Sequence, residues 1–268
     1  MQTIIITGAS DGIGAQLARQ LAQHLGGDVH LVLAARQEPL LQQVASSCQA
    51  SGARVSVMRT DVSDPQQCRQ LIANTLALCG GIDVLINNAG VSAHAMLAEV
   101  HPDDLTWYES LMRVNFWGSV WCTHAALPHL RERQGRIVAV SSLAGLVGVP
   151  GRTAYSASKY AMTGFFEALR TELRGSGVSV TTAYPGVVDT QIRVNGLNAK
   201  GQTAGSSGLK EDKAMPVAEC AALILQGMWA RERDVVMTWQ GKVGRWVKLI
   251  APGLVEKMAW AALKNPQK

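Results

Sequence analysis

The sequence has no uninterrupted apolar run near the roughly 18 to 20 residues that a helix needs to cross a bilayer. It also has no linker that divides its 268 residues and, over most of the chain, no block of Lys and Arg. Charged residues make up 17% and hydrophobic residues 47% of the composition, which is typical of a folded globular protein. The net charge of +5 therefore does not favour nucleic-acid binding, and a phosphate-rich cofactor with a basic tail accounts for it.

Cysteine is scarce and shows no pattern. The sequence has five cysteines, an odd number, with no Cys-x-x-Cys pair and no His at the spacing of a metal ligand. We interpret them as reduced structural thiols, which predicts no metal site and a cytoplasmic protein. The chain enters an apolar strand within a few residues of Met1, so no secretory signal is expected. The cysteines are Cys48, Cys68, Cys79, Cys122 and Cys220.

Short apolar runs alternate with helical patterns along most of the chain. This alternation predicts one doubly wound α/β domain of the Rossmann type with a parallel sheet, over residues 1–240. A basic and apolar extension, 241–268, follows it. The expected strands are 3–7, 29–35, 55–59, 82–87, 136–141, 178–184 and 235–239, and the expected helices are 15–25, 38–50, one from Pro65, a long one from Asp103, one through Tyr155, and 217–231.

A glycine-rich turn follows the first expected strand. The turn runs Gly8-Ala9-Ser10-Asp11-Gly12-Ile13-Gly14 and opens the first expected helix. Glycines let the backbone approach a pyrophosphate, and the helix N-terminus offers free N–H groups to the anion. A tight connection without a ligand is the alternative, but the position in the first βα unit favours a dinucleotide site.

A second group of polar residues follows the strand 136–141. Ser142 stands at the carboxyl end of that strand, whereas Tyr155 and Lys159 are four residues apart and share one helix face. An ammonium beside a phenol favours the phenolate, so we expect a lowered pKa for Tyr155. A hydroxyl, an acidified tyrosine and a lysine are the groups needed for reversible proton transfer to a substrate oxygen.

These residues resemble the active site of the short-chain dehydrogenase/reductase family. The Ser to Tyr spacing of 155 − 142 = 13, the Thr-Gly-x-x-x-Gly-x-Gly turn and the tetrad Asn87-Asn88-Ala89-Gly90 all match it. The resemblance spans residues 3 to 240 and implies a sheet of about seven strands and a homodimer or homotetramer. It further implies that Tyr155 transfers the proton, Ser142 binds the substrate oxygen, Lys159 binds the nicotinamide ribose, and Asn115 helps to hold a water linked to the lysine.

The resemblance also assigns the cofactor contacts. The Pro-Gly turn after residues 178–184 is expected near the nicotinamide, whose carboxamide binds the backbone of Val188. Asp61 is expected at the adenine or, alternatively, as a turn residue; Asn87 is expected to hold the sheet together, and Asn88 to reach the ribose side. The implied set is Gly8, Ser10, Gly12, Ile13, Gly14, Arg36, Asp61, Val62, Asn88, Ala89, Gly90, Tyr155, Lys159, Pro185, Gly186, Val188 and Thr190.

The residues after the second expected strand favour NADP(H) over NAD(H). An NAD site would place a carboxylate there for the ribose 2′-hydroxyl, but this chain has Ala35 and then Arg36. A guanidinium binds a 2′-phosphate in a charge-assisted pair. Relatives that use NADP(H) often carry a Lys or Arg inside the glycine-rich turn as well, where this chain has Asp11.

The expected substrate end is apolar, which favours a hydrophobic alcohol or ketone, such as a steroid-like, lipid or xenobiotic molecule. An NAD-dependent enzyme or an acyl-thioester reductase is the alternative, and a nucleotide-sensing scaffold without turnover would be expected to lack Tyr155 or Lys159. Segment 191–215 is either a lid or an inert loop. The extension 241–268 covers the substrate mouth, caps the body or a partner, or lies in a membrane interface. The substrate candidates are Ala93, His94, Met96, Leu143, Leu146, Val147 and Val149.

Overall fold

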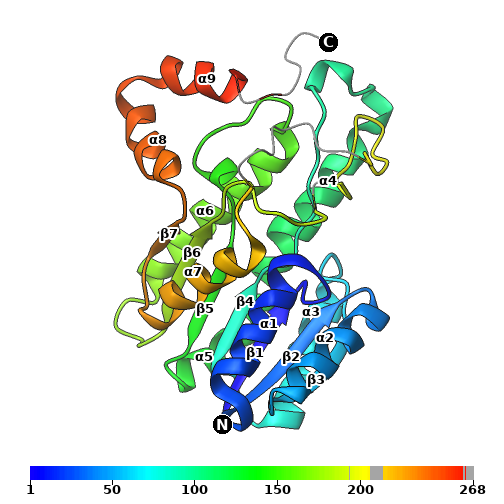
Figure 1. Ribbon diagram of the computed structural model, residues 1–268, viewed down its shortest axis with the longest axis vertical. Helices are drawn as coiled ribbons and strands as arrows, with labels where there is room; N and C mark the ends of the chain where they lie inside the picture. Colours follow the sequence, from blue (N-terminus) through cyan, green and yellow to red (C-terminus); the bar gives the residue numbers. More distant parts are fainter. Residues whose placement is uncertain (193, 206–213, 262, 264–268) are drawn as a thin grey trace.

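The computed structural model describes residues 1–192, 194–205, 214–261 and 263 of the chain. Its described strands form one parallel sheet of seven in the order β3-β2-β1-β4-β5-β6-β7, which confirms the predicted doubly wound Rossmann-type fold (Figure 1). The strands are β1 (Gln2–Thr7), β2 (Val29–Ala35), β3 (Arg54–Arg59), β4 (Val84–Asn87), β5 (Arg136–Val140), β6 (Ser179–Tyr184) and β7 (Asp234–Val236).

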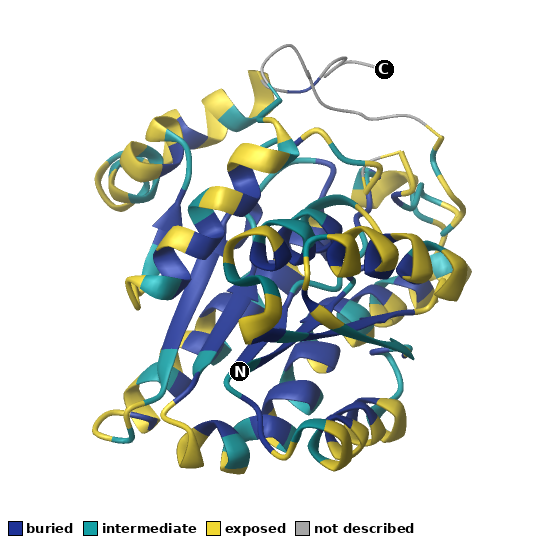
Figure 2. Cartoon of the chain, turned by 60° about the horizontal axis from the view of Figure 1, so that its bottom comes forward, coloured by how far each residue is buried: buried dark blue, intermediate teal, exposed yellow. Residues whose placement is uncertain are grey.

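Helices cover both faces of the sheet. Along β1, Ile4 and Ile6 pack in one core layer, whereas Ile5 packs in the other, because successive side chains of a strand point to opposite faces. Both layers are apolar, so the inner strands have mostly apolar sequences, and Figure 2 shows these strands as buried, whereas the edge strand β3 is only partly buried. The first layer holds α1 (Gly12–Leu25), α2 (Glu38–Ala50) and α7 (Val217–Trp229); the second holds α3 (Pro65–Cys79), α5 (Gly118–Glu132) and α6 (Thr153–Glu172).

The long helix expected from Asp103 is divided. A 3₁₀ turn at Pro102–Leu105 precedes α4 (Thr106–Met112), and a π-helical turn, Arg113–Trp117, separates α4 from α5. A π turn holds one more residue than an α turn and re-aims the side chains in it. Here the turn carries Asn115, which is completely buried.

The C-terminal extension begins earlier than expected. Strand β7 ends at Val236 because Thr238 caps the next helix, its hydroxyl accepting a hydrogen bond from Gly241 N at 3.1 Å. Two helices follow, α8 (Trp239–Ile250) and α9 (Pro252–Ala261), while the last residues of the predicted extension, 264–268, lie outside the described residues. Within the described part of the chain, no helix is long and apolar enough to span a membrane.

Candidate active site

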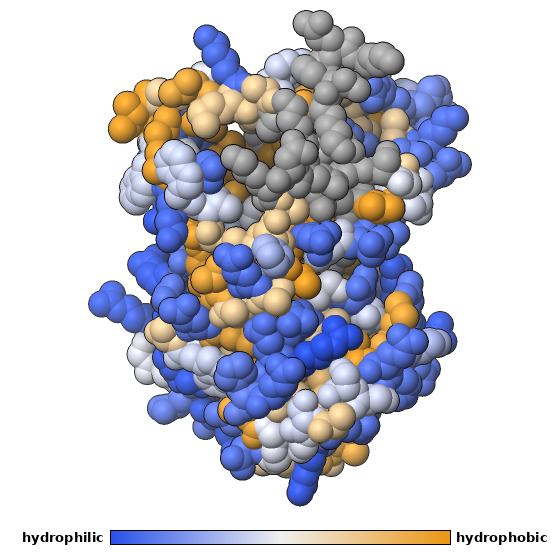
Figure 3. Space-filling model, viewed as in Figure 1, coloured by the Kyte–Doolittle hydropathy of each residue, from blue (hydrophilic) through white to orange (hydrophobic). Residues whose placement is uncertain are grey.

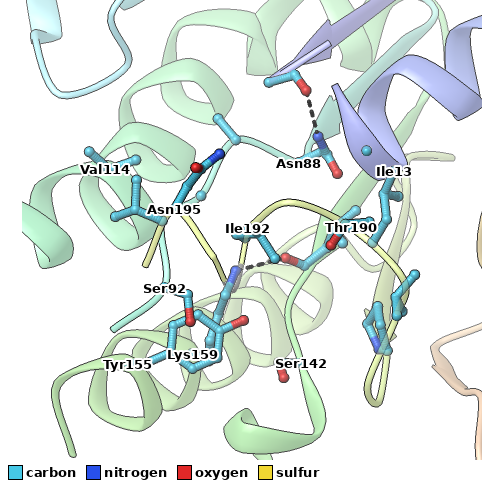
Figure 4. Close-up of a pocket in the computed structure, with 18 of the residues that line it drawn as sticks. Ile13, Asn88, Ser92, Val114, Ser142, Tyr155, Lys159, Thr190, Ile192 and Asn195 are labelled. Atoms are coloured by element: carbon cyan, nitrogen blue, oxygen red, sulfur yellow. Dashed lines mark hydrogen bonds between the residues drawn. The ribbon is translucent and has the colours of Figure 1, made fainter. Parts of the chain in front are cut away.

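A cleft of about 780 Å³ opens along the carboxyl edge of the sheet. It spans the point between β1 and β4 where the strand order reverses, which is where doubly wound folds bind ligands. Of the predicted catalytic and cofactor-binding residues, only Gly14 and Asn115 do not line it. The cleft brings together Gly8, Ser10, Gly12, Ile13, Arg36, Asp61, Val62, Asn88, Ala89, Gly90, Ser142, Tyr155, Lys159, Pro185, Gly186, Val188 and Thr190, and Figure 4 shows part of this lining.

The glycine-rich turn is shaped for a close backbone approach. Gly8 and Gly12 have φ values of +66° and +54°, which L side chains rarely adopt. A Cβ on Gly14 would lie 2.2 Å from the Gly8 carbonyl oxygen, so Gly14 lets α1 pack on the turn instead of touching the cleft. Asp11 caps α1 by accepting a hydrogen bond from Gly12 N at 2.7 Å. The positive end of α1 therefore faces a groove in which Gly8 and Gly12 present backbone without a Cβ, which fits the pyrophosphate of a dinucleotide.

Thr7 and Asn88 fix this turn to β4. The Thr7 hydroxyl accepts hydrogen bonds from the backbone N–H of Asn88 at 3.0 Å and of Ala89 at 3.1 Å. The Asn88 amide donates to the carbonyls of Thr7 and Gly8, so it holds the turn in addition to lining the cleft. Asn87 donates to the Thr123 hydroxyl at 2.9 Å and joins β4 to α5. Thr7 was not predicted as a site residue, although the sequence shows its hydroxyl at the end of an apolar strand, where it could have been found.

The end of the cleft next to β2 and β3 is basic. Arg36 follows β2, and Arg59 ends β3 in register with Ala35. Both arginines line a polar pocket of about 400 Å³ with Asp61 and Gln67, and this pocket shares Arg36 and Asp61 with the main cleft. Arg59 was not predicted, because only strand pairing places it beside Arg36.

Asp61 forms the predicted turn and also lines the cleft. Its carboxylate accepts hydrogen bonds from the backbone N–H and the hydroxyl of Ser63, at 2.9 and 2.7 Å, and so forms a turn. The turn leads into α3 at Pro65, as expected, with Asp64 as the capping residue. The turn places Asp61 in the cleft lining beside Arg36.

Ser142, Tyr155 and Lys159 gather at the opposite end of the cleft (Figure 4). Burial raises the pKa of Tyr155, while the charge of Arg152 and a hydrogen bond with Ser142 lower it by less. The guanidinium carbon of Arg152 lies 5.5 Å from the centroid of the Tyr155 ring. The expectation of a lowered Tyr155 pKa is therefore wrong for this structure, because desolvation of the phenol outweighs the nearby charges.

Lys159 is turned toward the end of β5. Its ammonium donates to the Val140 carbonyl at 3.0 Å and lies 5.8 Å from the centroid of the Tyr155 ring. The side chain is only 3% exposed, and burial lowers the pKa of Lys159 to about 8. Lys159 and Tyr155 share a helix face as predicted, but the lysine binds a backbone carbonyl rather than the phenol.

Asn115 supports the site from behind the lining. Its side-chain oxygen accepts from Val91 N at 2.8 Å, and its amide donates to Val91 O and to the Ser158 hydroxyl, both at 2.9 Å. Ser158 in turn donates to the Tyr155 carbonyl at 2.8 Å. Asn115 thus joins the segment after Gly90 to helix α6.

The end of the cleft at Ser142 and Tyr155 is formed from more segments than predicted. Of the apolar candidates, Leu143 and Val149 line the cleft, whereas Ala93, His94, Met96, Leu146 and Val147 do not. Segment 191–215 contributes lining residues, although 193 and 206–213 lie outside the described residues. The unpredicted lining residues here are Ser92, Val114, Arg152, Ile192, Asn195, Thr203 and Ala259 of α9.

The fold and the cleft together define a nicotinamide-dependent oxidoreductase. A model of the short chain dehydrogenase family matches residues 2–200. The chain therefore belongs to the short-chain dehydrogenase/reductase family, as predicted, and is an NAD(P)-dependent oxidoreductase acting on CH–OH groups. Among the described residues, no group of three or more His, Cys, Asp or Glu side chains is placed to hold a metal ion.

Curated relatives are similar over nearly the whole chain. An 11-beta-hydroxysteroid dehydrogenase A from Sesamum indicum is 35% identical over 95% of this chain and 73% of its own length. An 11-beta-hydroxysteroid dehydrogenase-like 4A from Arabidopsis thaliana is 36% identical, over 95% and 82%. A dehydrogenase/reductase SDR family member 7B from Mus musculus is 32% identical, over 99% and 82%.

Solved structures share the architecture. A short chain dehydrogenase/reductase from Burkholderia phymatum in complex with NAD has a TM-score of 0.81 and 26% identity, with 94% of both chains covered. An alcohol dehydrogenase from Thermococcus sibiricus complexed with 5-hydroxy-NADP has a TM-score of 0.74 over 88% of this chain and 96% of its own. At 24% identity, the second structure supports the fold alone.

Proposed function

We propose that the protein interconverts a hydrophobic alcohol and its ketone or aldehyde with NADP(H). The observation that carries this proposal is one continuous cleft with Tyr155 and Ser142 at its substrate end and Arg36 at its adenosine end. The bound cofactor supplies or accepts hydride at the carbon that carries the substrate oxygen.

The protein's own groups handle the substrate oxygen and its proton. The Tyr155 hydroxyl gives its proton to a carbonyl oxygen, or takes one from an alcohol, and the Ser142 hydroxyl hydrogen-bonds the same oxygen. Because burial raises the pKa of Tyr155, the phenol is protonated near neutral pH and is ready to act as the donor in carbonyl reduction. Lys159, at the floor of the cleft, is the group suited to hold the nicotinamide ribose.

The preference for NADP(H) rests on two guanidinium groups. Arg36 and Arg59 border the same polar pocket, and both are charges that a 2′-phosphate would bind. The carboxylate of Asp61 borders this pocket too, but it is already bound to the N–H and hydroxyl of Ser63.

The proposed substrate is a steroid-like, lipid or xenobiotic molecule. Leu143, Val149, Val114 and Ile192 give the catalytic end of the cleft apolar walls, which favour an apolar body beside the reacting oxygen. The names of the plant relatives, which are 11-beta-hydroxysteroid dehydrogenases, support the same substrate class. An acyl thioester is the competing substrate of the same chemistry.

We place the protein in the cytoplasm as a homodimer or homotetramer. The five cysteines are all free, in keeping with a reducing compartment. Trp117 of the π turn is 44% exposed and stacks on Trp121 of α5 with ring centroids 5.8 Å apart, an aromatic surface suited to contact between subunits. Light scattering should give the mass of a dimer or tetramer, and a lower mass for Trp117→Ser. A monomeric wild-type protein would contradict this proposal.

The function is tested by following NADPH oxidation over a carbonyl panel. The panel should contain 3-oxosteroids and 11-oxosteroids, long-chain ketones, small aromatic aldehydes and acetoacetyl-coenzyme A. We expect turnover of an apolar ketone or aldehyde and a loss of about 100-fold or more in Tyr155→Phe, with NADPH binding retained. Full activity in Tyr155→Phe would overturn the mechanism, and exclusive turnover of the thioester would overturn the substrate class.

A further inference from the structure

Helix α8 turns its apolar face away from the protein. Trp239, Val243, Trp246 and Ile250 follow one another at the spacing of a single helix stripe, and they are 68%, 47%, 61% and 88% exposed. Leu249 beside them is 73% exposed. A surface helix of a globular protein ordinarily packs this stripe on the core.

The opposite face of α8 packs on the body by small and polar residues. Gly241 is buried, and a Cβ there would lie 2.4 Å from the Leu143 side chain. The ammonium of Lys248 donates to the Leu146 carbonyl at 3.0 Å and to the Tyr160 hydroxyl at 2.6 Å. These contacts fix the orientation of the helix, so the outward apolar face is built into the fold.

Helix α9 continues this surface and reaches the cleft. Leu254, Met258 and Trp260 are 52%, 58% and 46% exposed, whereas Val255 is buried. Ala259 of the same helix lines the cleft. Figure 1 shows both helices beyond the carboxyl ends of the strands, and Figure 3 shows apolar atoms gathered over them. The extension therefore contributes Ala259 to the lining of the cleft and has an apolar exterior.

The chemistry of this surface fits an anionic lipid bilayer. Its eight side chains in 239–260 are more than half of the fifteen exposed large apolar side chains among the described residues. Lys242 and Lys257 are exposed on the same two helices, and Glu256 is their one acidic residue. Tryptophan is enriched at the boundary between headgroups and acyl chains, and lysine reaches the phosphates. Two copies of this surface would both be net positive, with Glu256 as the one acidic residue on each, which opposes their pairing.

We propose that α8 and α9 dock the protein on a membrane that contains anionic lipid, so that an apolar substrate enters the cleft from the bilayer. The docking follows from the exposed side chains alone, whereas substrate entry from the lipid rests on the proposed function. The two parts can therefore fail separately.

Vesicle flotation without cofactor or substrate tests the docking. Wild-type protein should float with vesicles of phosphatidylcholine and phosphatidylserine, and less with phosphatidylcholine alone. The double variant Trp246→Glu/Ile250→Glu should lower the partition coefficient about 100-fold, because two apolar side chains no longer enter the lipid. The control is Leu78→Glu on α3, where an apolar side chain of similar exposure, 62%, lies outside this surface; it should float as the wild type does.

A second measurement separates docking from folding and from catalysis. The double variant should reduce a small water-soluble carbonyl at the wild-type rate and lose rate only with an apolar ketone supplied in the same vesicles. Wild-type protein that stays in solution, or equal flotation of the double variant and the wild type, would overturn the docking. A wild-type dimer that becomes monomeric in the double variant would assign this face to a second copy instead. Equal rates with the vesicle-borne ketone would remove substrate entry from the bilayer.

Discussion

Replacing Arg36 or Arg59 by Ala should weaken the use of NADPH and leave the use of NADH unchanged. Both residues are exposed, and a contact between exposed charges contributes at most about 1 kcal/mol, which is about fivefold in affinity. Each single variant should therefore raise the KM for NADPH about fivefold, and the double variant about 25-fold if the two contacts are independent.

Arg54→Ala is the matched control for this experiment. Arg54 is as exposed as Arg59 but stands at the other end of β3, about 16 Å away at the rise of an extended strand. That distance exceeds the Debye length of about 8 Å at physiological ionic strength, so the charge change should not reach the 2′-phosphate.

The assay is kcat/KM for NADPH and NADH with one carbonyl substrate, repeated at low and high salt. The wild-type preference for NADPH should fall as salt rises, and the Arg36→Ala/Arg59→Ala variant should show little salt dependence. Equal losses with both cofactors, or a wild-type enzyme that uses NADH as well as NADPH, would refute the assignment of a 2′-phosphate site.

Three further predictions follow from other contacts. Gly14→Ala should lower both the melting temperature and the affinity for NADPH, because its Cβ would meet the Gly8 carbonyl oxygen at 2.2 Å. The control is Gly164→Ala on α6, where a Cβ would have no atom within 4 Å; this variant should raise the melting temperature slightly. The pKa of Lys159 falls from 10.5 to about 8 on folding, so the unfolded chain binds more protons than the folded protein between these pH values. The free energy of unfolding from urea titrations should therefore rise by about 3 kcal/mol across this range relative to Lys159→Met. Parallel pH profiles of the two proteins would contradict this. Arg152→Met should raise the apparent pKa in the pH–rate profile of alcohol oxidation, because the Arg152 charge lowers the pKa of Tyr155. Arg152→Lys keeps the charge and should bring the apparent pKa most of the way back to the wild-type value. An unmoved profile in Arg152→Met would show that Arg152 does not act on the phenol.

The sequence was sufficient for the elements of the sheet and for most of the cleft. Strand β2 and helix α2 have the predicted bounds, because a continuous apolar run buried on both faces and a helical pattern are local signals. The glycine-rich turn and the pair Tyr155 and Lys159 were also local, since each depends on a spacing within one element. In a parallel sheet, the residues that follow the carboxyl ends of the strands meet at one edge, and this does not depend on the conformation of the loops.

Only the tertiary structure decided how side chains from distant segments meet. Arg59 comes beside Arg36 through the pairing of β2 with β3, and Arg152 comes over Tyr155 through the fold of the loop before α6. Lys159 binds Val140 rather than the phenol, because a buried ammonium takes the nearest carbonyl acceptor. The sequence likewise showed that the C-terminal extension is apolar and basic. Which face of α8 is outward depends on the contacts of Gly241 and Lys248 with a loop about a hundred residues away, and no local pattern contains that information.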